Sequence, residues 1–600
     1  MGKSEENENR LRHMIACMMH ESSYISGQYV CEGLRSWLGW VGFKDSFSDC
    51  MPLWNENRDI CMIFSGEDYT DPDQIADLKK KGHEFESAKA SYLVHFYEDL
   101  GADFFQKLNG RFCGVILDYR HKKTILFNDR YGLNRIYYHE KDGMFLFSSE
   151  AKSLLLILPE LRKLDFGGLA EIFSFGCVTQ NKTLYSGISL IPGGSAWTFQ
   201  TGQDTRKSAY FSSKQLESLE PLSCSEYYEK LKETWIRILP RYLHAPEQAA
   251  ISLTGGKDSR MILAWAQSPP GSLPCYTFGG PYRDCFDVKI ARRVASICKQ
   301  PFQVIRIDKT FFREFSNYAE RTVFLTDGNR DVSGSPGIFV NKLARQIAPV
   351  RLTGNYGQEI LRSSIAFKPM PIFTGILESG FQRLVESAAQ IYYHELCGNR
   401  LSFVAFKQVP WHHYATLAAE LSQVTLRSPF LDNEILELAY KAPADPTISE
   451  DMQIRLIAEG NAELGKIETD RGLLYKPVPL YTSIKHQIQE FTFKAEYAYD
   501  YGMPHLLAKF DNLFKMLHLE RLFLGRHKFT HFRIWYRDEL SGYIKQILLD
   551  SRTLKRPYLQ GRSIEKMVRA HINGTGNYTL EIHKLLTVEL IQRQLIEQKG

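Results

Sequence analysis

The sequence has no marked excess of charge of either sign. Its 600 residues carry 74 basic and 69 acidic side chains, which give a formal net charge of +5. A protein that binds nucleic acid through its surface carries basic residues in clear excess, so this balance argues against a nucleic-acid partner. A small anionic ligand needs only a local site, and the charge balance does not exclude one.

Paired cysteines and long apolar runs are also missing. The eleven cysteines are scattered, and none forms a C-x-x-C pair or a Cys/His group with the spacing of a zinc site. Such a pattern predicts reduced thiols in a cytoplasmic protein. No apolar run reaches the roughly 18 residues that a membrane-spanning helix needs, and residues 1–13 are too polar for a signal peptide. We therefore expect a cytoplasmic protein without a membrane partner.

The length of the chain and its N-terminal pattern predict more than one domain. Six hundred residues are too many for one hydrophobic core. In residues 46–211, short apolar strands alternate with turn residues, which predicts an α+β domain with largely antiparallel sheets. Residues 212–224 are polar and rich in Ser, Glu and Pro, as is typical of a linker. We expect strands at 60–64, 114–117, 124–127 and 144–147, and a helix at 90–100.

The part beyond the linker has a different pattern. Strand-like stretches alternate with helical ones, and this alternation predicts a parallel, doubly wound sheet. The strands are expected at 249–253, 275–278 and 302–307, and the helices at 225–239, 259–267 and 287–298. From residue 401 to residue 598 the spacing of apolar residues is mostly helical.

Residues 253–259, Leu-Thr-Gly-Gly-Lys-Asp-Ser, stand between a strand and a helix of this second domain. The two glycines let the backbone turn tightly and approach a phosphate. Backbone N–H groups and the following helix N-terminus form an anion site, to which hydroxyl groups can add donors. A carboxylate repels phosphate, so Asp258 is interpreted as a ligand of Mg²⁺ that bridges to phosphate oxygens. The residues assigned to phosphate binding are Thr254, Gly255, Gly256 and Ser259.

A second loop, residues 352–359, follows the strand-like residues 349–352. The short motif of the first loop can also occur in a plain structural turn. The position of the two loops in the fold decides between a structural turn and a phosphate site. Ligands of doubly wound sheets bind at the carboxyl ends of the strands. Both loops follow strands, so we expect them to face each other across one crevice, with Glu359 as a second acid.

The first loop resembles the Ser-Gly-Gly-x-Asp-Ser pyrophosphatase loop of the asparagine synthetase superfamily, with Thr254 in place of the first Ser. Further segments agree in the right order. They are Leu-Asn-Gly-Arg-Phe at 108–112, Asn-Asp-Arg-Tyr-Gly-Leu-Asn-Arg-Ile-Tyr-Tyr at 128–138, Phe-Ser-Ser-Glu-Ala-Lys at 147–152, Arg-Ser-Pro-Phe-Leu-Asp at 427–432 and a C-terminal helix at 581–595. The chain is identified as a member of this superfamily from about residue 39 to residue 595.

The resemblance implies a fold and a reaction. Residues 1–211 would form an Ntn-hydrolase-like sandwich of the type 2 glutamine amidotransferase kind, and residues 225–600 a PP-loop ATP pyrophosphatase domain, with 212–224 between them. ATP and Mg²⁺ would be the cofactors: AMP is transferred to a substrate carboxylate, pyrophosphate leaves, and ammonia or an amine attacks the adenylate. Adenylation gives a poor electrophile a good leaving group, and the enzyme positions the groups and stabilises charge. Leu253, Phe278 and Gly279 match positions whose backbone holds adenine and ribose.

The N-terminal domain departs from the glutamine-hydrolysing members. These begin Met-Cys, and the cysteine is a nucleophile whose own α-amine is the base. This chain begins Met1-Gly2, and its first cysteine, Cys17, lacks a free α-amine. Residues 65–67 resemble the family's Asn-Gly-Glu segment with Ser for Asn, and the acidic residue expected before the helix at 90–91 is missing. We expect a domain without glutaminase activity; a misassigned Met1 or a partner that supplies ammonia stays open.

The second loop also departs from the superfamily pattern, Ser-Gly-Glu-Gly-Ala-Asp-Glu. Without a gap, Gln358 falls on the metal-binding Asp. With Asn355 as an insertion, the loop instead resembles the Thr-Gly-Tyr-Gly-Ser-Asp loop of β-lactam synthetases, and Glu359 takes the metal-binding position. We prefer the gapped alignment because Mg²⁺ needs hard anionic oxygen. It assigns Thr353 and Gly354 to the nucleotide site, and Asp258 and Glu359 to the metal.

The remaining predicted catalytic residues are Tyr356, Glu420 and Arg471. Tyr356 falls on the tyrosine of the β-lactam synthetase loop. It can deprotonate an incoming amine only if its pKa of about 10 is lowered or a carboxylate assists, and Glu420 is the candidate assistant. The alternative for Tyr356 is a packing aromatic. The family's late lysine near the pyrophosphate is matched by Arg471, with Lys466 and Lys476 as rivals; an arginine keeps the charge but delivers no proton.

Three functions remain open. The leading one is an amide ligase of the asparagine synthase type, acting on a small-molecule or short-peptide carboxylate with ammonia or an amine. In one version it makes asparagine or amidates another carboxylate; in the other it joins a substrate's own amine and carboxylate, as β-lactam synthetases and lasso-peptide cyclases do. The missing N-terminal cysteine and the Tyr-Gly loop favour the second version or a specialised amidation. The intact first loop argues against an inert binding paralogue, and the charge balance argues against a tRNA-modifying enzyme. Whether the protein forms a homodimer stays open.

Overall fold

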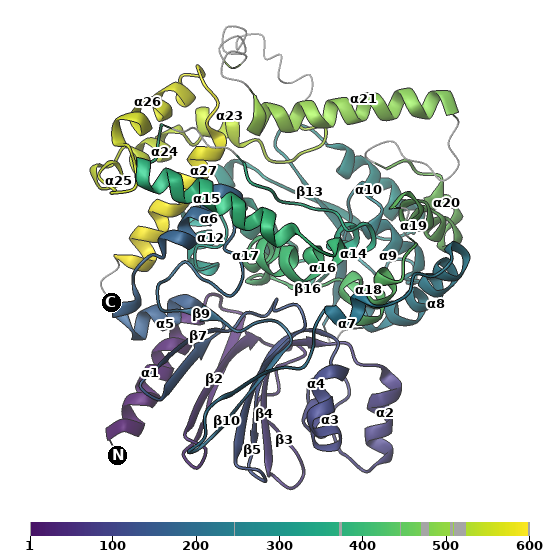
Figure 1. Ribbon diagram of the computed structural model, residues 1–600. Coiled ribbons are helices and arrows are strands. Elements are labelled where there is room, and N and C mark those ends of the chain that lie inside the picture. Colours follow the sequence, from purple (N-terminus) through teal and green to yellow (C-terminus); the bar gives the residue numbers. More distant parts are fainter. Residues whose placement is uncertain are drawn as a thin grey trace.

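The computed structural model of the protein describes residues 2–244, 247–370, 375–443, 446–469, 479–503, 508 and 524–597. Its N-terminal part carries antiparallel sheets and its C-terminal part a parallel sheet, and the two parts are stacked against each other (Figure 1). This mixed α/β architecture agrees with the predicted fold class at that level. Across the described ranges, no helix combines the length and the apolar character needed to cross a membrane.

The N-terminal part is built around a six-stranded antiparallel sheet with the strand order β11-β10-β6-β5-β4-β3. The predicted strands at 60–64, 114–117 and 124–127 lie within its buried centre, where apolar runs are longest, and the fourth lies in β8 of a separate sheet. The bounds are β3 (Leu53–Trp54), β4 (Ile60–Asp68), β5 (Gly110–Asp118), β6 (Lys123–Asn128), β8 (Met144–Ser148), β10 (Ser195–Gln200) and β11 (Arg206–Ala209). The predicted helix at 90–100 is α3 (Tyr92–Leu100).

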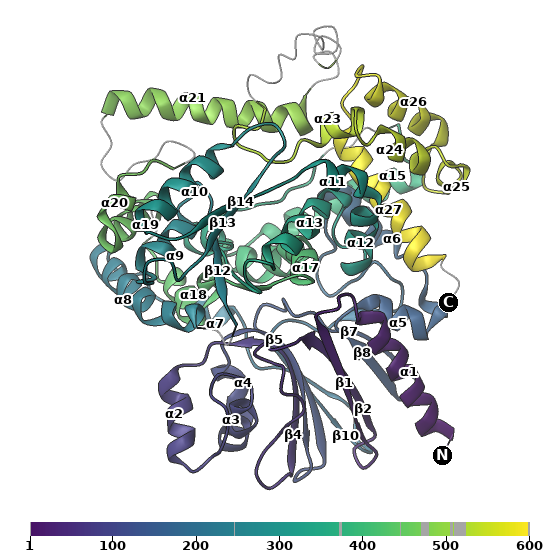
Figure 2. The same ribbon diagram turned by 180° about the vertical axis from the view of Figure 1, so that it is seen from behind.

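The first 45 residues form elements that the sequence patterns did not predict. Helix α1 (Gly2–Met18) packs against β2 (Ser36–Phe43) and α5 (Ala151–Ile157), and β2 pairs with β1 (Tyr24–Cys31) in a two-stranded sheet (Figure 2). The contact between α1 and β2 is close. A Cβ at Gly39 would lie 2.7 Å from Ile15 Cδ1, so a larger residue at this position would require the Ile15 side chain to shift.

The C-terminal part contains a five-stranded parallel sheet with the order β14-β13-β12-β15-β16. Its strands are β12 (Ala249–Ser252), β13 (Cys275–Gly279), β14 (Phe302–Arg306), β15 (Val350–Leu352) and β16 (Thr425–Arg427). Helices α9 (Asp258–Trp265) and α10 (Phe286–Ile297) lie on one side of the sheet, and α13 (Ser335–Ala344) lies on the other (Figure 2). The predicted parallel sheet is therefore confirmed. Strand β16 was not predicted, because three residues leave no pattern in a mostly helical region.

The direction of the strand order reverses between β12 and β15. From β12 the chain moves outward to β13 and β14, and it then returns to add β15 on the other side of β12. Loops that leave adjacent strands at such a switch point diverge around a crevice at the carboxyl end of the sheet. The topology therefore places the loop after β12 beside the loop after β15.

The predicted linker is docked on the C-terminal part. It contains the one-turn helix α7 (Lys214–Glu217), and the Glu217 carboxylate accepts a hydrogen bond from Ser402 Oγ at 2.5 Å. Farther along, the Leu222 N–H donates to the Lys441 carbonyl at 2.9 Å. Helix α8 (Cys224–Leu243) then begins with a capping box, in which the side chains of Ser223 and Glu226 each accept from the other's backbone N–H.

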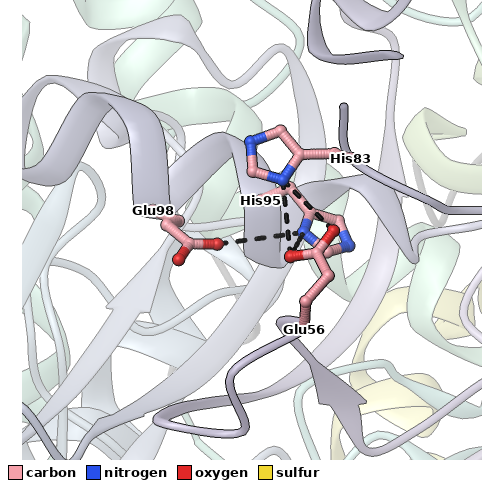
Figure 3. A group of neighbouring side chains, drawn as sticks. All are labelled: Glu56, His83, His95 and Glu98. Atoms are coloured by element: carbon pink, nitrogen blue, oxygen red, sulfur yellow. Dashed lines mark hydrogen bonds and ion pairs between the residues drawn. The ribbon is translucent and has the colours of Figure 1, made fainter. Parts of the chain in front are cut away.

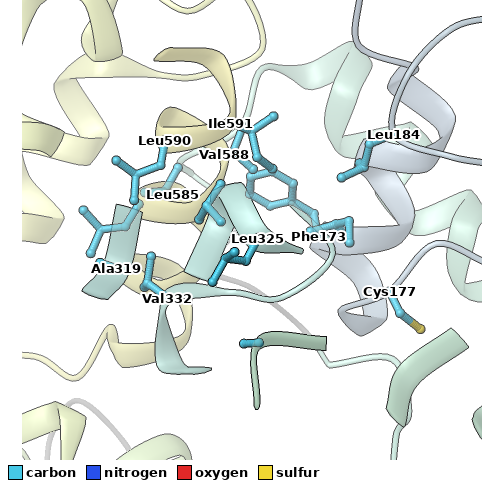
Figure 4. Close-up of a cluster of buried hydrophobic side chains, with 14 of the residues drawn as sticks. Phe173, Cys177, Leu184, Ala319, Leu325, Val332, Leu585, Val588, Leu590 and Ile591 are labelled. Carbon is cyan, nitrogen blue, oxygen red and sulfur yellow. The ribbon is translucent and has the colours of Figure 1, made fainter. Parts of the chain in front are cut away.

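The largest hydrophobic core joins the two parts. Phe173 and Leu184 from the N-terminal part pack in one cluster with residues of α12 (Phe315–Leu325) and of the last long helix, α27 (Thr579–Ile591) (Figure 4). Helix α27 is buried around its whole circumference. Gly328 has φ = +75°, a left-handed backbone that favours glycine at this turn, and a Cβ there would lie 2.6 Å from Ile591 Cδ1.

Candidate active site

The first loop connects β12 to α9 and is shaped by its own side chains. The Thr254 N–H donates to Ser259 Oγ at 3.1 Å, and the Gly256 N–H donates to Thr254 Oγ1 at 3.3 Å. The Gly255 N–H donates to Asp287 Oδ1 at 2.6 Å. The four residues assigned to phosphate binding thus form one compact turn at the N-terminus of α9, and a helix N-terminus in this setting favours an anion.

The second loop lies directly against the first. A Cβ at Gly354 would lie 2.5 Å from Ser259 N, and a Cβ at Gly357 would lie 2.6 Å from Asp258 Oδ1. Any side chain at these two glycines would push the loops apart. The structure therefore brings together the two loops that the sequence pattern placed across one crevice.

A cavity of about 210 Å³ lies between the second loop and α9, and both predicted metal ligands line it. Its lining includes Asp258, Glu359, Tyr356, Asn355 and His413. Asp258 Oδ1 accepts a hydrogen bond from Gln453 Nε2 at 2.6 Å, and Asp258 Oδ2 lies 3.5 Å from Arg362 Nη2. Glu359 Oε1 lies 3.3 Å from His413 Nε2.

The two carboxylates affect each other electrostatically. Burial raises the pKa of Asp258 above its ordinary value, and the charge of Glu359 raises it further, while Arg362 and Gln453 act in the opposite direction. For Glu359, burial raises the pKa, but the contact with His413, a backbone hydrogen bond and the charge of Arg362 together leave the pKa of this carboxyl lowered. Two carboxylates that share one cavity supply the hard oxygen ligands that Mg²⁺ prefers. The residues present therefore fit a divalent cation of this kind.

Tyr356 borders the same cavity, and its hydroxyl is buried. Among the described residues, the Tyr356 hydroxyl has no hydrogen-bond partner, and burial raises the pKa of this phenol. The ring packs edge-on against His413, with 5.8 Å between ring centroids. Tyr356 has φ = +71°, a left-handed backbone that orders the turn before α14 (Gly357–Arg362). Burial therefore favours the protonated form of the Tyr356 hydroxyl.

Glu420, the predicted assistant of Tyr356, has another partner. Glu420 Oε2 accepts from Arg351 Nη1 at 2.7 Å, and the guanidinium of Arg351 also donates to Ser252 Oγ at 2.9 Å. Glu420 therefore fixes an arginine of β15 to the end of β12. The sequence pattern gave no sign of this ion pair because the two residues are 69 positions apart.

The positions matched to adenine and ribose lie along the neighbouring strands. The Leu253 N–H donates to the Tyr276 carbonyl at 2.8 Å, so Leu253 extends the sheet by one residue beyond β12. Phe278 and Gly279 end β13, and the guanidinium of Arg351 lies 5.1 Å from the centre of the Phe278 ring. On the second loop, the Thr353 N–H donates to the Arg427 carbonyl of β16 at 3.0 Å.

Arg471 and its rival Lys476 lie outside the described residues. The described residues just before them are held at the first loop by Arg260 of α9. Its guanidinium donates to the Gly255 carbonyl at 3.1 Å, to the Ile467 carbonyl at 2.5 Å and to the Glu468 carbonyl at 3.1 Å. Lys466, the other rival, pairs with exposed Glu463 on the surface at 2.5 Å.

Cys17 and the segment at 65–67 are the two features of the N-terminal part that bear on the comparison with the glutamine-hydrolysing members. Cys17 belongs to α1, and burial raises the pKa of its thiol to about 11. The Glu67 carboxylate is held by Arg427, whose Nε lies 2.9 and 3.0 Å from the two oxygens, and it also accepts from the Tyr69 hydroxyl at 2.6 Å. Both oxygens of Glu67 are thus already bound by the protein.

Sequence reasoning missed several residues that surround the two carboxylates. Arg362 and Gln453 contact Asp258, His413 contacts Glu359, and Arg260 ties the loop to residues 467 and 468. Arg362 stands three residues after Glu359 on the same short helix, so helical spacing was a usable signal for it. The others come from distant segments and have no such signal.

Comparisons with known proteins found one matching domain family and several sequence relatives. The glutamine amidotransferase domain family matches residues 1–211. Asparagine synthetase [glutamine-hydrolyzing] 1 of Bacillus subtilis (strain 168) is 22% identical over 416 residues, which span 67% of this chain and 63% of that protein. The putative asparagine synthetase [glutamine-hydrolyzing] 1 of Methanocaldococcus jannaschii is 23% identical over 430 residues, 70% of this chain and 71% of that protein. The chain thus covers less than two thirds of the length of the first of these relatives.

Similarity to solved structures is weak. The glutamine phosphoribosylpyrophosphate amidotransferase from B. subtilis, complexed with ADP and GMP, has 11% sequence identity and a TM-score of 0.21, covering 44% of this chain and 50% of that one. This likeness supports no conclusion here. Fold, loops and sequence relatives together define a two-part protein with an amidotransferase-like N-terminal domain and a parallel-sheet C-terminal domain. Over 67–70% of its length the chain is similar to asparagine synthetases, and its residues 1–211 match the glutamine amidotransferase domain family.

Proposed function

We propose that this protein is an ATP-dependent amide ligase that adenylates a substrate carboxylate, releases pyrophosphate, and lets ammonia or an amine attack the adenylate. The observation that carries the proposal is the packing of Gly354 and Gly357 against the loop at Asp258, which sets two carboxylates beside a glycine-rich turn in one cavity. The family relationship supports the same class of reaction, since its relatives are asparagine synthetases.

The chain's own residues divide the work. The turn at Gly255 and Gly256 and the N-terminus of α9 would bind the phosphates, and Asp258 and Glu359 would hold Mg²⁺, which supplies charge stabilisation as pyrophosphate leaves. Arg260 holds the first loop to residues 467 and 468. Arg471, which is outside the described residues, stays the proposed cation for pyrophosphate. Arg362 adds positive charge 3.5 Å from Asp258.

We further propose that the protein does not hydrolyse glutamine. Cys17 lies within α1 with a thiol whose pKa is raised to about 11 by burial, so it offers neither a thiolate nor an α-amine as base. Glu67, in the segment that resembles the glutamine-binding Asn-Gly-Glu, already uses its carboxylate to hold Arg427 and Tyr69. Nitrogen would then come from ammonia or from an amine, including an amine of the substrate itself.

Pyrophosphate release from ATP tests this proposal, with a panel of carboxylates and with ammonium, amines or glutamine as nitrogen donors. We expect Asp258→Asn to slow release at least about a hundredfold, because loss of a metal ligand removes several kcal/mol of charge stabilisation. Asp204→Asn is the matched control, since Asp204 is exposed on the turn between β10 and β11. Equal rates for Asp258→Asn and the parent protein would refute the metal assignment.

The nitrogen donor separates the versions of the function. Turnover with ammonium and not with glutamine supports the proposal, and a cyclic product without any added amine identifies the intramolecular version. Glutamine-dependent turnover that Cys17→Ala abolishes would refute the absence of glutaminase activity. ATP binding without pyrophosphate release for any carboxylate would indicate the inert paralogue.

A further inference from the structure

A cluster of two histidines and two glutamates lies in the N-terminal part, outside the site described above. Glu56 is in the turn between β3 and β4, His83 follows α2 (Pro72–Lys80), and His95 and Glu98 are on α3. The ligand atoms of all four side chains lie within 4.8 Å of one another, and the side chains converge on one point (Figure 3). We propose that this cluster is a binding site for Zn²⁺ or a similar divalent transition-metal ion.

The separations of the ligand atoms suit a small tetrahedral ion. His95 Nδ1 lies 3.2 Å from Glu56 Oε2, His83 Nδ1 lies 3.4 Å from the same oxygen, and His95 Nδ1 lies 3.9 Å from Glu98 Oε2. Zinc bonds to nitrogen and oxygen are about 2.0–2.2 Å long, so the edge of a zinc tetrahedron is about 3.4 Å. Two of the three separations match this edge, and the third needs a shift of a few tenths of an ångström.

Two buried atoms in the cluster have no hydrogen-bond partner among the described residues. They are His95 Nδ1 and Glu98 Oε2, and the side chain of His95 is 3% exposed. His95 Nδ1 is close to carboxylate oxygens, but the geometry of a hydrogen bond is missing. Buried polar atoms without partners are rare and call for an explanation such as an ion. A metal ion placed between them would satisfy both atoms at once.

The surroundings hold the ligands by their other atoms. Asn55 Nδ2 donates to Glu98 Oε1 at 2.9 Å, which leaves Oε2 facing the cluster. His83 Nε2 lies 3.4 Å from Asp99 Oδ1, so the ring can present Nδ1 to the metal while its other nitrogen meets a carboxylate. Protein metal sites commonly orient their histidines in this way. Burial also lowers the pKa of His95, which favours the neutral imidazole that binds metals.

The ligand set decides the chemical class of the ion. Two imidazoles with two carboxylates favour zinc and its transition-metal neighbours, whereas Mg²⁺ and Ca²⁺ prefer oxygen ligands alone. The site is distinct from the two carboxylates at the carboxyl end of the parallel sheet. It joins the β3–β4 turn to α2 and α3, which lie together at one edge of the N-terminal part (Figure 1). An ion there would tie these three segments together.

Titration of the full-length protein with zinc tests the proposal. The protein is stripped with a chelator, and Zn²⁺ is then added in competition with a chromophoric chelator. We expect one tight site per chain, and at least about a hundredfold weaker binding for His83→Ala and for Glu98→Gln, the second of which keeps an acceptor for Asn55. His13→Ala is the control, since His13 is exposed on α1. The side chains of both test residues are partly exposed, and circular dichroism verifies that the variants fold.

Two further measurements separate this site from adventitious binding. Asp99→Asn should weaken zinc binding about tenfold, as is typical for loss of a group that orients a metal-bound histidine. Zinc should also raise the melting temperature of the parent protein but not that of His83→Ala. Three outcomes would each overturn the proposal. The first is the absence of a one-to-one site, and the second is equal zinc affinity in the parent and in both ligand variants. The third is a thiolate charge-transfer band in the absorption spectrum when Co²⁺ replaces Zn²⁺.

Discussion

The ion pair between Glu67 and Arg427 joins the two parts of the molecule and allows a quantitative prediction. Glu67 is on β4 of the N-terminal sheet, and Arg427 ends β16 of the parallel sheet. Their side chains are 11% and 4% exposed, and Arg427 Nε lies 2.9 and 3.0 Å from the two carboxylate oxygens. Arg427 also donates to the His244 carbonyl at 2.6 Å, so the guanidinium is held from both sides.

Replacing Glu67 by Gln removes the charge while nearly preserving the shape. At these separations and an effective dielectric constant of about 20, the attraction is on the order of 5 kcal/mol. Much of it is offset in the native protein by the cost of taking both charges out of water. The variant retains the buried positive charge of Arg427 but loses its compensation, so we expect a cost of about 3–5 kcal/mol.

Native-state hydrogen exchange measures this cost at the interface itself, which avoids the assumption that two domains unfold in one step. The useful amides are those of Thr353, which donates to the Arg427 carbonyl, and Asn433, which donates to Asn109 Oδ1 across the interface. Glu140→Gln is the matched control. Its partner is Lys207 at 2.7 Å, and side-chain exposures of about 40% make that pair worth at most about 1 kcal/mol.

The result that would refute the reasoning is a Glu67→Gln variant whose interface amides lose no more protection than those of Glu140→Gln. A double-mutant cycle with Arg427→Met adds a second criterion. Replacing both partners should cost less than replacing Glu67 alone, because no uncompensated charge then remains buried. If the double variant is the less stable one, the cost comes from packing and not from the charge.

Two further predictions concern the active site and the acid range. Gly357→Ala would place a Cβ 2.6 Å from Asp258 Oδ1. The rate of pyrophosphate release should therefore fall at least about tenfold, with little change in melting temperature. Gly33→Ala is the control, because Gly33 has open space around it and the substitution should leave the rate unchanged. Burial lowers the pKa of His412 to about 3. Below a pH of about 6.5, the ordinary pKa of histidine, the unfolded chain therefore binds a proton at His412 that the native state excludes. The free energy of unfolding then decreases as the pH falls, by up to about 1.4 kcal/mol per pH unit. His412→Phe, which can keep the stacking on Phe367, should flatten this slope in urea unfolding measured between pH 7 and pH 4; an unchanged slope would contradict the assignment.

Much of the fold could be predicted because it leaves local signals. The strands in β4, β5 and β6 are runs of apolar residues, and β12, β13 and β14 alternate with helices of regular spacing. The elements before residue 46 were missed because α1 is mostly polar and β1 and β2 are only partly buried, which weakens the alternation that marks a strand.

The family segments show what local pattern cannot convey. The segment at 108–112 and the segment at 427–432 were recognised as markers, yet in the structure they touch each other. Asn109 Nδ2 donates to Asp432 Oδ2 at 2.8 Å, and the Tyr131 hydroxyl of the 128–138 segment donates to the Leu431 carbonyl at 2.9 Å. Their partners are about 300 residues away in sequence, so only the folded chain reveals that these segments form the contact between the two parts.

The sequence by itself determined the two-part organisation, the parallel sheet and the glycine-rich loop at residues 253–259, because these depend on local propensity and spacing. Tertiary structure decided how individual side chains are used. It pairs Glu420 with Arg351, and it brings the His83–His95 cluster together from three separate segments. It also buries the Tyr356 hydroxyl without a hydrogen-bond partner among the described residues, and this burial raises the pKa of the phenol. The physical reason is that pKa values, ion pairs and metal sites depend on burial and on neighbours that are distant in sequence, and neither is encoded in a local pattern.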